Sequence, residues 1–304
     1  MKIKKMSLED FKKSMSSFYV DSSFEEEMKK KQEAMVKDIR KELKDINTRE
    51  GLEKYIRSDK DALKILTSFL GISEERFKRI VSMIRRMDGD YFSTEWSIRV
   101  IRNKMINDSK YMEKICELLL EGKNNSDYYN NIPNYILDQI IIDDNKMKFI
   151  KNKYALRQHI SKSFEGIYSN AVGDKIEKVL EEKIDLWCKK YNTTYVHEKR
   201  VSWITRNIDF IIPNEKNPKI LIEVSYMVTT GSGQTTKQRD EHSIRLDIDA
   251  YKRKNRTEVI FVNFIDGGGW LGRQNDLELM YIDSDYVINL SNIDDLEYII
   301  EEFG

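Results

Sequence analysis

The sequence predicts a mixed α/β protein: a helical N-terminal region followed by an α/β domain whose central mixed sheet is flanked by helices. Two observations lead to this fold class. Up to about residue 165 the apolar residues recur mainly at helical spacing, and from Gly166 onward helical stretches alternate with short β-prone runs. The 304 residues are enough for two domains, which we place at 1–165 and 166–304.

The N-terminal region is expected to be a series of helices. Residues 24–45 are charged and rich in strong helix formers. The helices Asp61–Leu70 and Ser73–Met87 are separated by Gly71, and Ser73 is a suitable N-cap because its hydroxyl can accept a hydrogen bond from a first-turn amide. Further helices are expected at about 94–107, 109–121 and 145–160, with a polar loop at Asn124–Asn131.

The C-terminal region begins with a helix and continues with strand-like runs separated by further helices. Its expected elements are a helix Gly173–Lys190, strands Thr194–Ile204, Ile208–Pro213 and Lys219–Met227, a helix Gln238–Lys254, a strand Glu258–Ile265, a helix near Arg273–Met280, a strand Tyr286–Leu290 and a helix from about Ile293. The first three strands follow one another directly, so we expect a meander. The helix after them is then a crossover to a further strand.

The composition limits the classes of function. Lys plus Arg and Asp plus Glu number 52 each, so the net charge is zero and any basic surface for nucleic acid must be local. Cys116 and Cys188 lie in apolar helical contexts, which argues against a disulfide framework or a cysteine-bound zinc. Without a GxxxxGK[ST] motif, a nucleotide cofactor has no support. Without an apolar run of ~18 residues or a signal-like N-terminus, we expect a cytoplasmic protein with no membrane partner.

Two acidic residues stand inside the apolar runs on either side of a Pro/Asn turn, Asp209 in the first run and Glu223 in the second. An acid inside an apolar strand is costly unless something pairs with it. A hairpin that brings two acids side by side makes a site for a hard cation such as Mg²⁺, with the Val224 carbonyl as a third candidate ligand. Metal-dependent phosphodiester hydrolysis requires such a site. The alternative is that both acids lie on an edge and face solvent.

This element order, with Asp209 on the second strand and Glu223 on the third, resembles the PD-(D/E)XK nuclease superfamily, which includes the type II restriction endonucleases. The resemblance covers residues 166–304. Two shorter segments, Val262–Arg273 and the Gly/Ser loop Thr229–Gln234, look like parts of DpnII/MboI-type enzymes. The resemblance implies a Mg²⁺-dependent nuclease in which Asp209 and Glu223 are the motif acids. Trp270, in the first segment, is expected to be a packing anchor rather than a base-stacking residue.

One position departs from the motif, because Ser225 stands where these nucleases usually have Lys. Ser225 shares a strand face with Glu223 and can bind a metal-bound water, but it carries no charge. We expect the missing cation to come from Lys199 or Lys237, with Gln234 as a polar alternative. Glu177, on the preceding helix, is an additional catalytic candidate because an acid at that place can reach the metal in this fold. A surface role is the alternative for Glu177.

The segment Gly231–Arg239 is polar and basic, and we expect a flexible loop that approaches DNA. Lys237 and Arg239, together with Lys199 on an earlier strand, suit phosphate contacts. Gln234 and Gln238 could read a base edge. The alternative is an ordinary surface loop.

A second candidate DNA surface lies in the N-terminal half. Residues 63–87 have a helix–turn–helix outline, and two pairs of basic residues, Lys78 with Arg85 and Arg79 with Arg86, recur seven residues apart. Each pair therefore shares a helix face, as in a helix that docks on DNA. The alternative is the solvated basic face of an ordinary bundle helix.

These observations lead to one functional hypothesis and two rivals. The hypothesis is a Mg²⁺-dependent, sequence-specific endonuclease of restriction type that cleaves double-stranded DNA, with the N-terminal region gripping DNA or mediating dimerisation. Cutting both strands of a symmetric site favours a homodimer, because one active site cuts one strand. The rivals are a non-catalytic DNA-binding module with a degenerate nuclease fold, and a repair or processing nuclease without site specificity.

Overall fold

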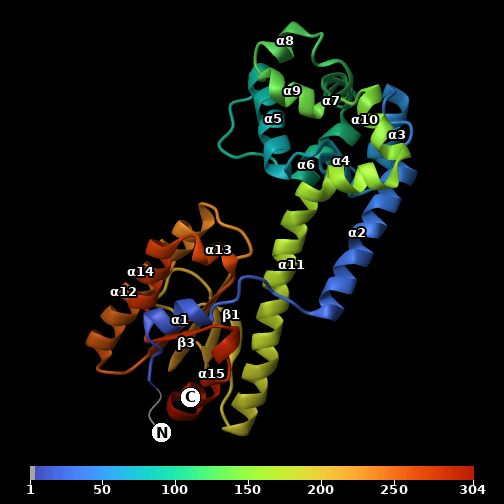
Figure 1. Cartoon of the computed structure of the whole chain (residues 1–304). Coiled ribbons are helices and arrows are strands. Elements are labelled where there is room, and N and C mark those ends of the chain that lie inside the picture. Colours follow the sequence, from blue (N-terminus) through green and yellow to red (C-terminus); the bar gives the residue numbers. More distant parts are fainter. Residues whose placement is uncertain (1–3) are drawn as a thin grey trace. The chain divides into compact units, whose positions relative to one another are not determined.

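The computed structural model describes residues 4–304, and for residues 162 and 163 it describes the backbone alone. The chain forms two compact units, one made of Met1–Val20 and Ser169–Gly304 and the other of Asp21–Tyr168. Figure 1 shows the first unit as a sheet with covering helices and the second as a group of helices. The predicted mixed α/β fold class is confirmed.

The helical unit buries one continuous apolar core. Its helices are α2 (Ser22–Glu42), α3 (Arg49–Ser58), α4 (Ala62–Leu70), α5 (Glu74–Met87), α6 (Ile98–Asn107), α7 (Ser109–Glu121), α8 (Ser126–Tyr129), α9 (Asn134–Ile140), α10 (Asp144–Lys151) and the first part of α11 (Lys153–Lys190). The predicted boundary between α4 and α5 is confirmed. Gly71 has a φ of 68° at the end of α4, and the Ser73 hydroxyl caps α5 by accepting a hydrogen bond from the Arg76 amide.

Two predictions for this unit were wrong in detail. The segment Asn124–Asn131, expected to be a loop, contains the short helix α8. The single helix expected at 145–160 is divided at Asn152, whose side-chain oxygen accepts hydrogen bonds from the Tyr154 and Ala155 amides. That cap starts α11 and separates it from α10.

Helix α11 continues without a break through Gly166, where the sequence pattern changes. A Cβ at Gly166 or Gly173 would meet no atom within 4 Å, so neither glycine marks a close approach. A helix tolerates such glycines at a cost of about 1 kcal/mol each. None of the described helices, α11 included, combines the length and apolar character that a membrane crossing requires.

The sheet confirms the predicted topology. Its strands are β1 (Val196–Lys199), β2 (Ile208–Ile212), β3 (Ile220–Tyr226), β4 (Ile260–Asp266) and β5 (Tyr286–Ile288), in the spatial order β1-β2-β3-β4-β5. The pairs β1–β2 and β2–β3 are antiparallel, so the first three strands form a meander. The pairs β3–β4 and β4–β5 are parallel, as a helical crossover requires.

The crossover helix α12 (Gly233–Asn255) packs on one face of the sheet. Its Ile244 and Ile248 bury against Ile211 and Leu221 of the strands. The remaining elements of this unit are α1 (Leu8–Ser14), α13 (Gly268–Leu271), α14 (Gln274–Asp283), the 3₁₀ turn Leu290–Asn292 and α15 (Asp295–Phe303). Because side chains alternate along β3, Leu221, Glu223 and Ser225 point to the face that α12 covers.

The N-terminal segment is built into the sheet unit through the buried carboxylate of Asp266, at the end of β4. One oxygen, Oδ1, accepts hydrogen bonds from the Ser16 amide at 2.7 Å, the Ser16 hydroxyl at 2.9 Å and the Gly267 amide at 2.7 Å. The other oxygen accepts one from the Leu290 amide at 2.9 Å. Phe11 of α1 belongs to one apolar cluster with Ile265 and Trp270 of the sheet unit. One side chain therefore joins three segments that are far apart in sequence.

We predict that Asp266→Asn destabilises the protein by at least about 2 kcal/mol, because the new amide NH₂ would face a backbone donor and leave it unsatisfied. Urea unfolding measures the change, and Glu278→Gln on the exposed side of α14 is the matched control. If both variants unfold at the wild-type midpoint, the Asp266 carboxylate does not hold these segments together.

Candidate functional site

The hairpin of β2 and β3 places Asp209 beside Glu223. Phe210 pairs with Ile222 in this antiparallel hairpin. Asp209 precedes Phe210 and Glu223 follows Ile222, so the two acids are neighbours across the strands. The Asp209 carboxylate accepts a hydrogen bond from the Val224 amide at 2.7 Å, which holds it against β3. The side chain of Asp209 is 28% exposed and that of Glu223 is 1% exposed, so the alternative of two solvent-facing acids does not apply to Glu223.

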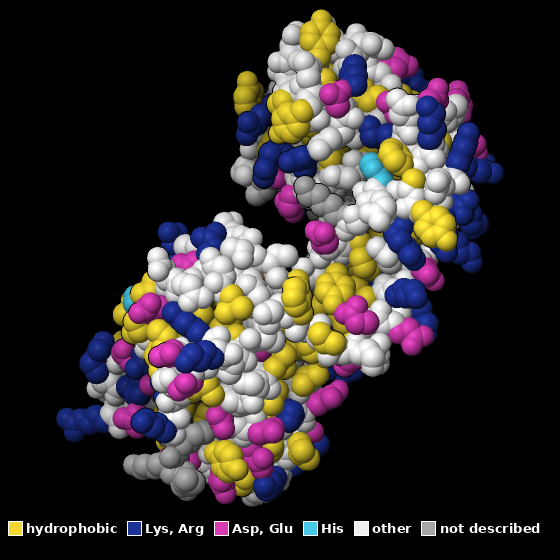
Figure 2. Space-filling model, in the orientation of Figure 1, with side chains coloured by type: hydrophobic (Ala, Val, Ile, Leu, Met, Phe, Trp, Pro, Cys, Tyr) yellow, Lys and Arg dark blue, Asp and Glu magenta, His cyan; other side chains and the backbone are white. Residues whose placement is uncertain are grey.

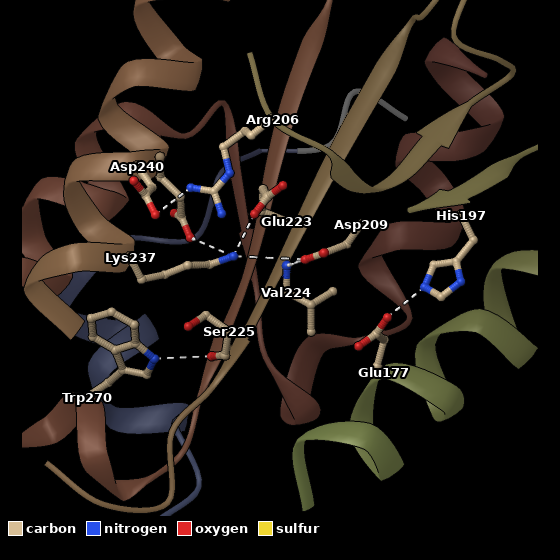
Figure 3. A network of polar contacts seen from close by, with 11 residues as sticks. Glu177, His197, Arg206, Asp209, Glu223, Val224, Ser225, Lys237, Asp240 and Trp270 are labelled. Carbon is tan, nitrogen blue, oxygen red and sulfur yellow. Dashed lines mark hydrogen bonds and ion pairs between the residues drawn. The ribbon is translucent and has the colours of Figure 1, made fainter. Parts of the chain in front are cut away.

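Lys237 enters this pair of acids from α12 (Figure 3). Its Nζ lies 2.6 Å from Glu223 Oε2, 4.0 Å from Asp209 Oδ2 and 3.7 Å from Glu241 Oε1. Because α12 begins at Gly233, Lys237 and Glu241 are one helical turn apart on the same face. The structure therefore surrounds a single ammonium group with three carboxylates.

Burial dominates the electrostatics of the two most enclosed acids. It raises the pKa of Glu223 above its ordinary value, against the opposing effect of Lys237. It raises the pKa of Glu241 to about 8. Burial acts in the other direction on Lys237, but the negative charges of Glu223, Glu241 and Asp209 outweigh it and raise the pKa of the ammonium. Lys237 is therefore charged at neutral pH, beside Glu223 and Glu241, whose pKa values are raised.

A second cation, Arg206, lies at the rim of the site in the segment between β1 and β2. Its Nη1 is 2.6 Å from Asp240 Oδ2 of α12. Burial lowers the pKa of Arg206, but the hydrogen bond to Asp240 and the charges of Glu223 and Asp209 outweigh it, so the pKa is raised. Arg206 is thus within electrostatic reach of both strand acids.

The donor set at this site fits a hard divalent cation. Glu223 Oε1 is buried and has no hydrogen-bond partner among the described residues, and Asp209 lies beside Glu223 on the neighbouring strand. Mg²⁺ prefers such oxygen ligands, and one or two carboxylates are sufficient when it retains water molecules. No group of three or more His, Cys, Asp and Glu residues in the described part of the chain has the arrangement of a metal site. The fit therefore rests on Asp209 and Glu223, and the Val224 carbonyl as a ligand stays a prediction.

Ser225 is not the residue that contacts the acids. It is buried, and its hydroxyl lacks a hydrogen-bond partner within residues 4–304. Its carbonyl accepts a hydrogen bond from the Trp270 indole at 3.1 Å, and Trp270 is fully buried. The packing role expected of Trp270 is confirmed.

Two other candidates lie outside this network. Glu177 of α11 is hydrogen-bonded to His197 of β1 at 2.6 Å, and His197 stacks on Phe210. Because side chains alternate along β2, Phe210 points away from the face to which Asp209 points. Figure 3 shows the Glu177–His197 pair to one side of the acids. Lys199 is exposed at the end of β1, and no described contact joins it or Glu177 to Asp209, Glu223 or Lys237.

The segment Gly231–Arg239 is not the flexible loop that we expected, because residues 233–239 form the first turns of α12. Gln234 is 1% exposed, and its amide is used internally: it accepts from the Gly231 amide and donates to the Thr229 carbonyl. Gln238 is also buried. In this conformation neither glutamine can reach a base edge, whereas Arg239 is exposed.

Arg85, one of the four residues of the expected basic face of α5, is buried. Arg85 is 5% exposed, and its guanidinium lies 3.9 Å from the ring centroid of Phe92 and 3.8 Å from that of Trp96. Its Nε donates to Asp90 Oδ2 at 2.7 Å. These contacts make Arg85 part of the packing of the helical unit, so it is not available to DNA.

The other three members of the expected basic face, Lys78, Arg79 and Arg86, are less enclosed. Lys78 forms an ion pair with Glu75, and Arg86 lies over Phe92. Arg79 is largely exposed, 3.9 Å from Glu95. On the face drawn in Figure 2, Lys and Arg side chains are interspersed with Asp and Glu on both units, in keeping with the net charge of zero.

Sequence reasoning missed Glu241, Arg206 and Asp240. Glu241 stands four residues after Lys237, which places the two on one helix face only if both belong to the helix. The expected helix began at Gln238, whereas α12 begins at Gly233 and includes Lys237. Arg206 stands three residues before Asp209 in a segment without periodicity, so its approach to the acids had no sequence signal.

Residues 143–303, more than half of the chain, match the family model of the BanI C-terminal domain, a restriction endonuclease domain. The chain therefore belongs to this family, which supports the predicted class, a type II restriction enzyme. The matched region contains the whole sheet together with Asp209, Glu223 and Glu241. No curated protein matches the chain.

The raised pKa of Glu241 predicts how stability depends on pH in metal-free protein. Between its ordinary pKa of 4.5 and about 8 the folded chain binds more protons than the unfolded chain, so this residue makes stability fall as pH rises through that window. Glu241→Gln removes the effect. Urea unfolding in EDTA at about pH 5 and about pH 8 should show a smaller loss of stability in the variant than in wild type. Equal losses would mean that Glu241 ionises normally.

Proposed function

We propose that the chain is a Mg²⁺-dependent, sequence-specific endonuclease for double-stranded DNA, with a PD-(D/E)XK-type site whose lysine is Lys237. The observation that carries this proposal is the position of the Lys237 ammonium, 2.6 Å from Glu223 and 4.0 Å from Asp209. The motif lysine is expected two residues after Glu223, where this chain has Ser225. Helix α12 delivers the same charge to the same pair of acids.

The topology supports the superfamily assignment. A meander carries one acid on β2 and one on β3, and α12 then leads to the parallel strand β4. The lysine is displaced from β3 to α12, but it remains beside both acids. Lys237 supplies the charge whose absence at Ser225 motivated the alternative of a non-catalytic module, and this supports a catalytic site.

The proposed chemistry divides charge between the metal and the protein. When bound, Mg²⁺ would polarise the scissile phosphate and lower the pKa of a water molecule. Asp209 and Glu223 would hold it, and the Val224 amide fixes the orientation of Asp209. Lys237 would stabilise negative charge that develops on the phosphate, because its ammonium lies beside both acids.

The family supports double-stranded DNA as the proposed substrate. Cleavage of both strands of a symmetric site favours two copies of the chain, because one active site cuts one strand. We therefore propose a homodimer. The rival is a processing nuclease without site specificity, and the pattern of cleavage products distinguishes the two.

We predict that Asp209→Ala, Glu223→Ala and Lys237→Met each reduce plasmid cleavage in Mg²⁺ by about 10²-fold or more, because each removes a ligand or a charge that acts at the phosphate. Binding to DNA in Ca²⁺, measured by gel shift, should persist. Lys254→Met, on the exposed end of α12, and Ser225→Ala are controls that should cut normally.

The cleavage products test the proposal itself. Discrete fragments from wild type support a restriction enzyme, whereas a smear or random nicks indicate a processing nuclease. A gel shift without cleavage would indicate a binding module. Normal cleavage by the Lys237→Met variant would show that the lysine of this site lies elsewhere.

Arg239 is the exposed basic residue nearest the site on α12, and we propose that it contacts a DNA phosphate, as does Lys199. Arg239→Ala should weaken binding to all sequences alike and lower the slope of log K against log salt by roughly 0.9. Arg253 is exposed in the last turn of the same helix. Arg253→Ala is the control and should leave the slope unchanged. An unchanged slope for Arg239→Ala would contradict the contact.

A further inference from the structure

Glu241 is the least explained charged group of the site. It is 1% exposed, and neither carboxylate oxygen has a hydrogen-bond partner among the described residues. Burying a carboxylate without hydrogen bonds is unfavourable unless another charge compensates for it. The nearest cation is the Lys237 ammonium, 3.7 Å from Glu241 Oε1 and one turn earlier on the same helix.

Lys237, in turn, is paired with Glu223, which is also a proposed metal ligand. Its ammonium group can donate three hydrogen bonds, and the described acceptor at hydrogen-bond distance is Glu223 Oε2, at 2.6 Å. Under the function proposed above, Glu223 and Asp209 also hold a divalent cation. The ammonium and the cation are then held by the same carboxylates and repel each other. Lys237 needs another carboxylate that is not a metal ligand, and Glu241 is within reach.

We propose that Glu241 is a positioning residue that retains Lys237 in the site when Asp209 and Glu223 take up the cation. This proposal rests on the proposed function of the same site. Glu241 then acts through Lys237: its carboxylate draws the ammonium toward α12 and leaves the strand acids to the metal. Its unpaired oxygens are the acceptors that Lys237 uses in the loaded state.

A double-mutant cycle tests whether Glu241 acts through Lys237. Calorimetry above about pH 8, where Glu241 is ionised, measures the Ca²⁺ affinity of the full chain for wild type, Glu241→Gln, Lys237→Gln and the double variant. Glu241→Gln alone should weaken Ca²⁺ binding by at least about threefold, because Lys237 then stays on Glu223. In the Lys237→Gln background the same change should have little effect, because no ammonium remains to be held. Asp247→Asn on α12 is the control and should leave the affinity unchanged.

Cleavage kinetics give a second readout. Glu241→Gln should lower kcat with an unchanged KM for DNA, and Glu241→Asp, which keeps the charge, should recover part of the loss. A structural role alone would lower the melting temperature without this split and without rescue. Melting curves of every variant show whether the folded state persists.

The outcomes separate this proposal from the one on which it rests. Equal weakening of Ca²⁺ binding by Glu241→Gln in both backgrounds would make Glu241 a metal ligand and overturn the positioning role. Unchanged Ca²⁺ affinity together with unchanged kcat would overturn it as well. If Asp209→Ala alters neither Ca²⁺ binding nor cleavage, the site itself is misplaced and both proposals fail.

Discussion

The ion pair between Lys237 and Glu223 is the interaction on which the rest of the site depends. Glu223 sits in the middle of β3 between apolar neighbours, where an isolated carboxylate would be strongly disfavoured. The ammonium group compensates for that charge and, in the same contact, ties the start of α12 to the sheet. A buried pair of this kind is weak evidence for stability, since desolvation offsets much of the attraction. Its value is that it places three carboxylates and one ammonium around a single point.

The ion pair between Lys237 and Glu223 also lies close to the start of α12. The sequence from Gly231 to Thr236 is poor in helix formers, so intrinsic propensity favours a loop. Tertiary contacts override that preference: Gln234 binds the preceding backbone through both ends of its amide, and Lys237 reaches Glu223. The parallel pairing of β3 with β4 requires a crossover in this interval, and these contacts hold the first turns of its helix in place.

The outline of the sheet could be predicted because each strand is a short apolar run between turn residues, and because a meander followed by a helix leaves few topologies. Asp209 and Glu223 stood out for the same reason, as charges inside those runs. Arg85 shows the limit of such reasoning. Its seven-residue spacing from Lys78 indicated a shared basic face, but Asp90, Phe92 and Trp96 enclose it. Spacing along a helix defines a face and does not reveal what covers it.

The position of the lysine shows what the chemistry demands of the fold. Under the proposed function, a phosphate beside the two acids requires a positive charge at a given point in space, and that point can be reached from β3 or from the helix above it. In this chain Ser225 is small and buried beneath α12, and Trp270 fixes its backbone. A lysine at Ser225 in addition to Lys237 would place a second ammonium against the same carboxylates, and the two charges would repel. The small residue on β3 and the long one on α12 are therefore two parts of one arrangement, and the departure from the motif is consistent with an intact site.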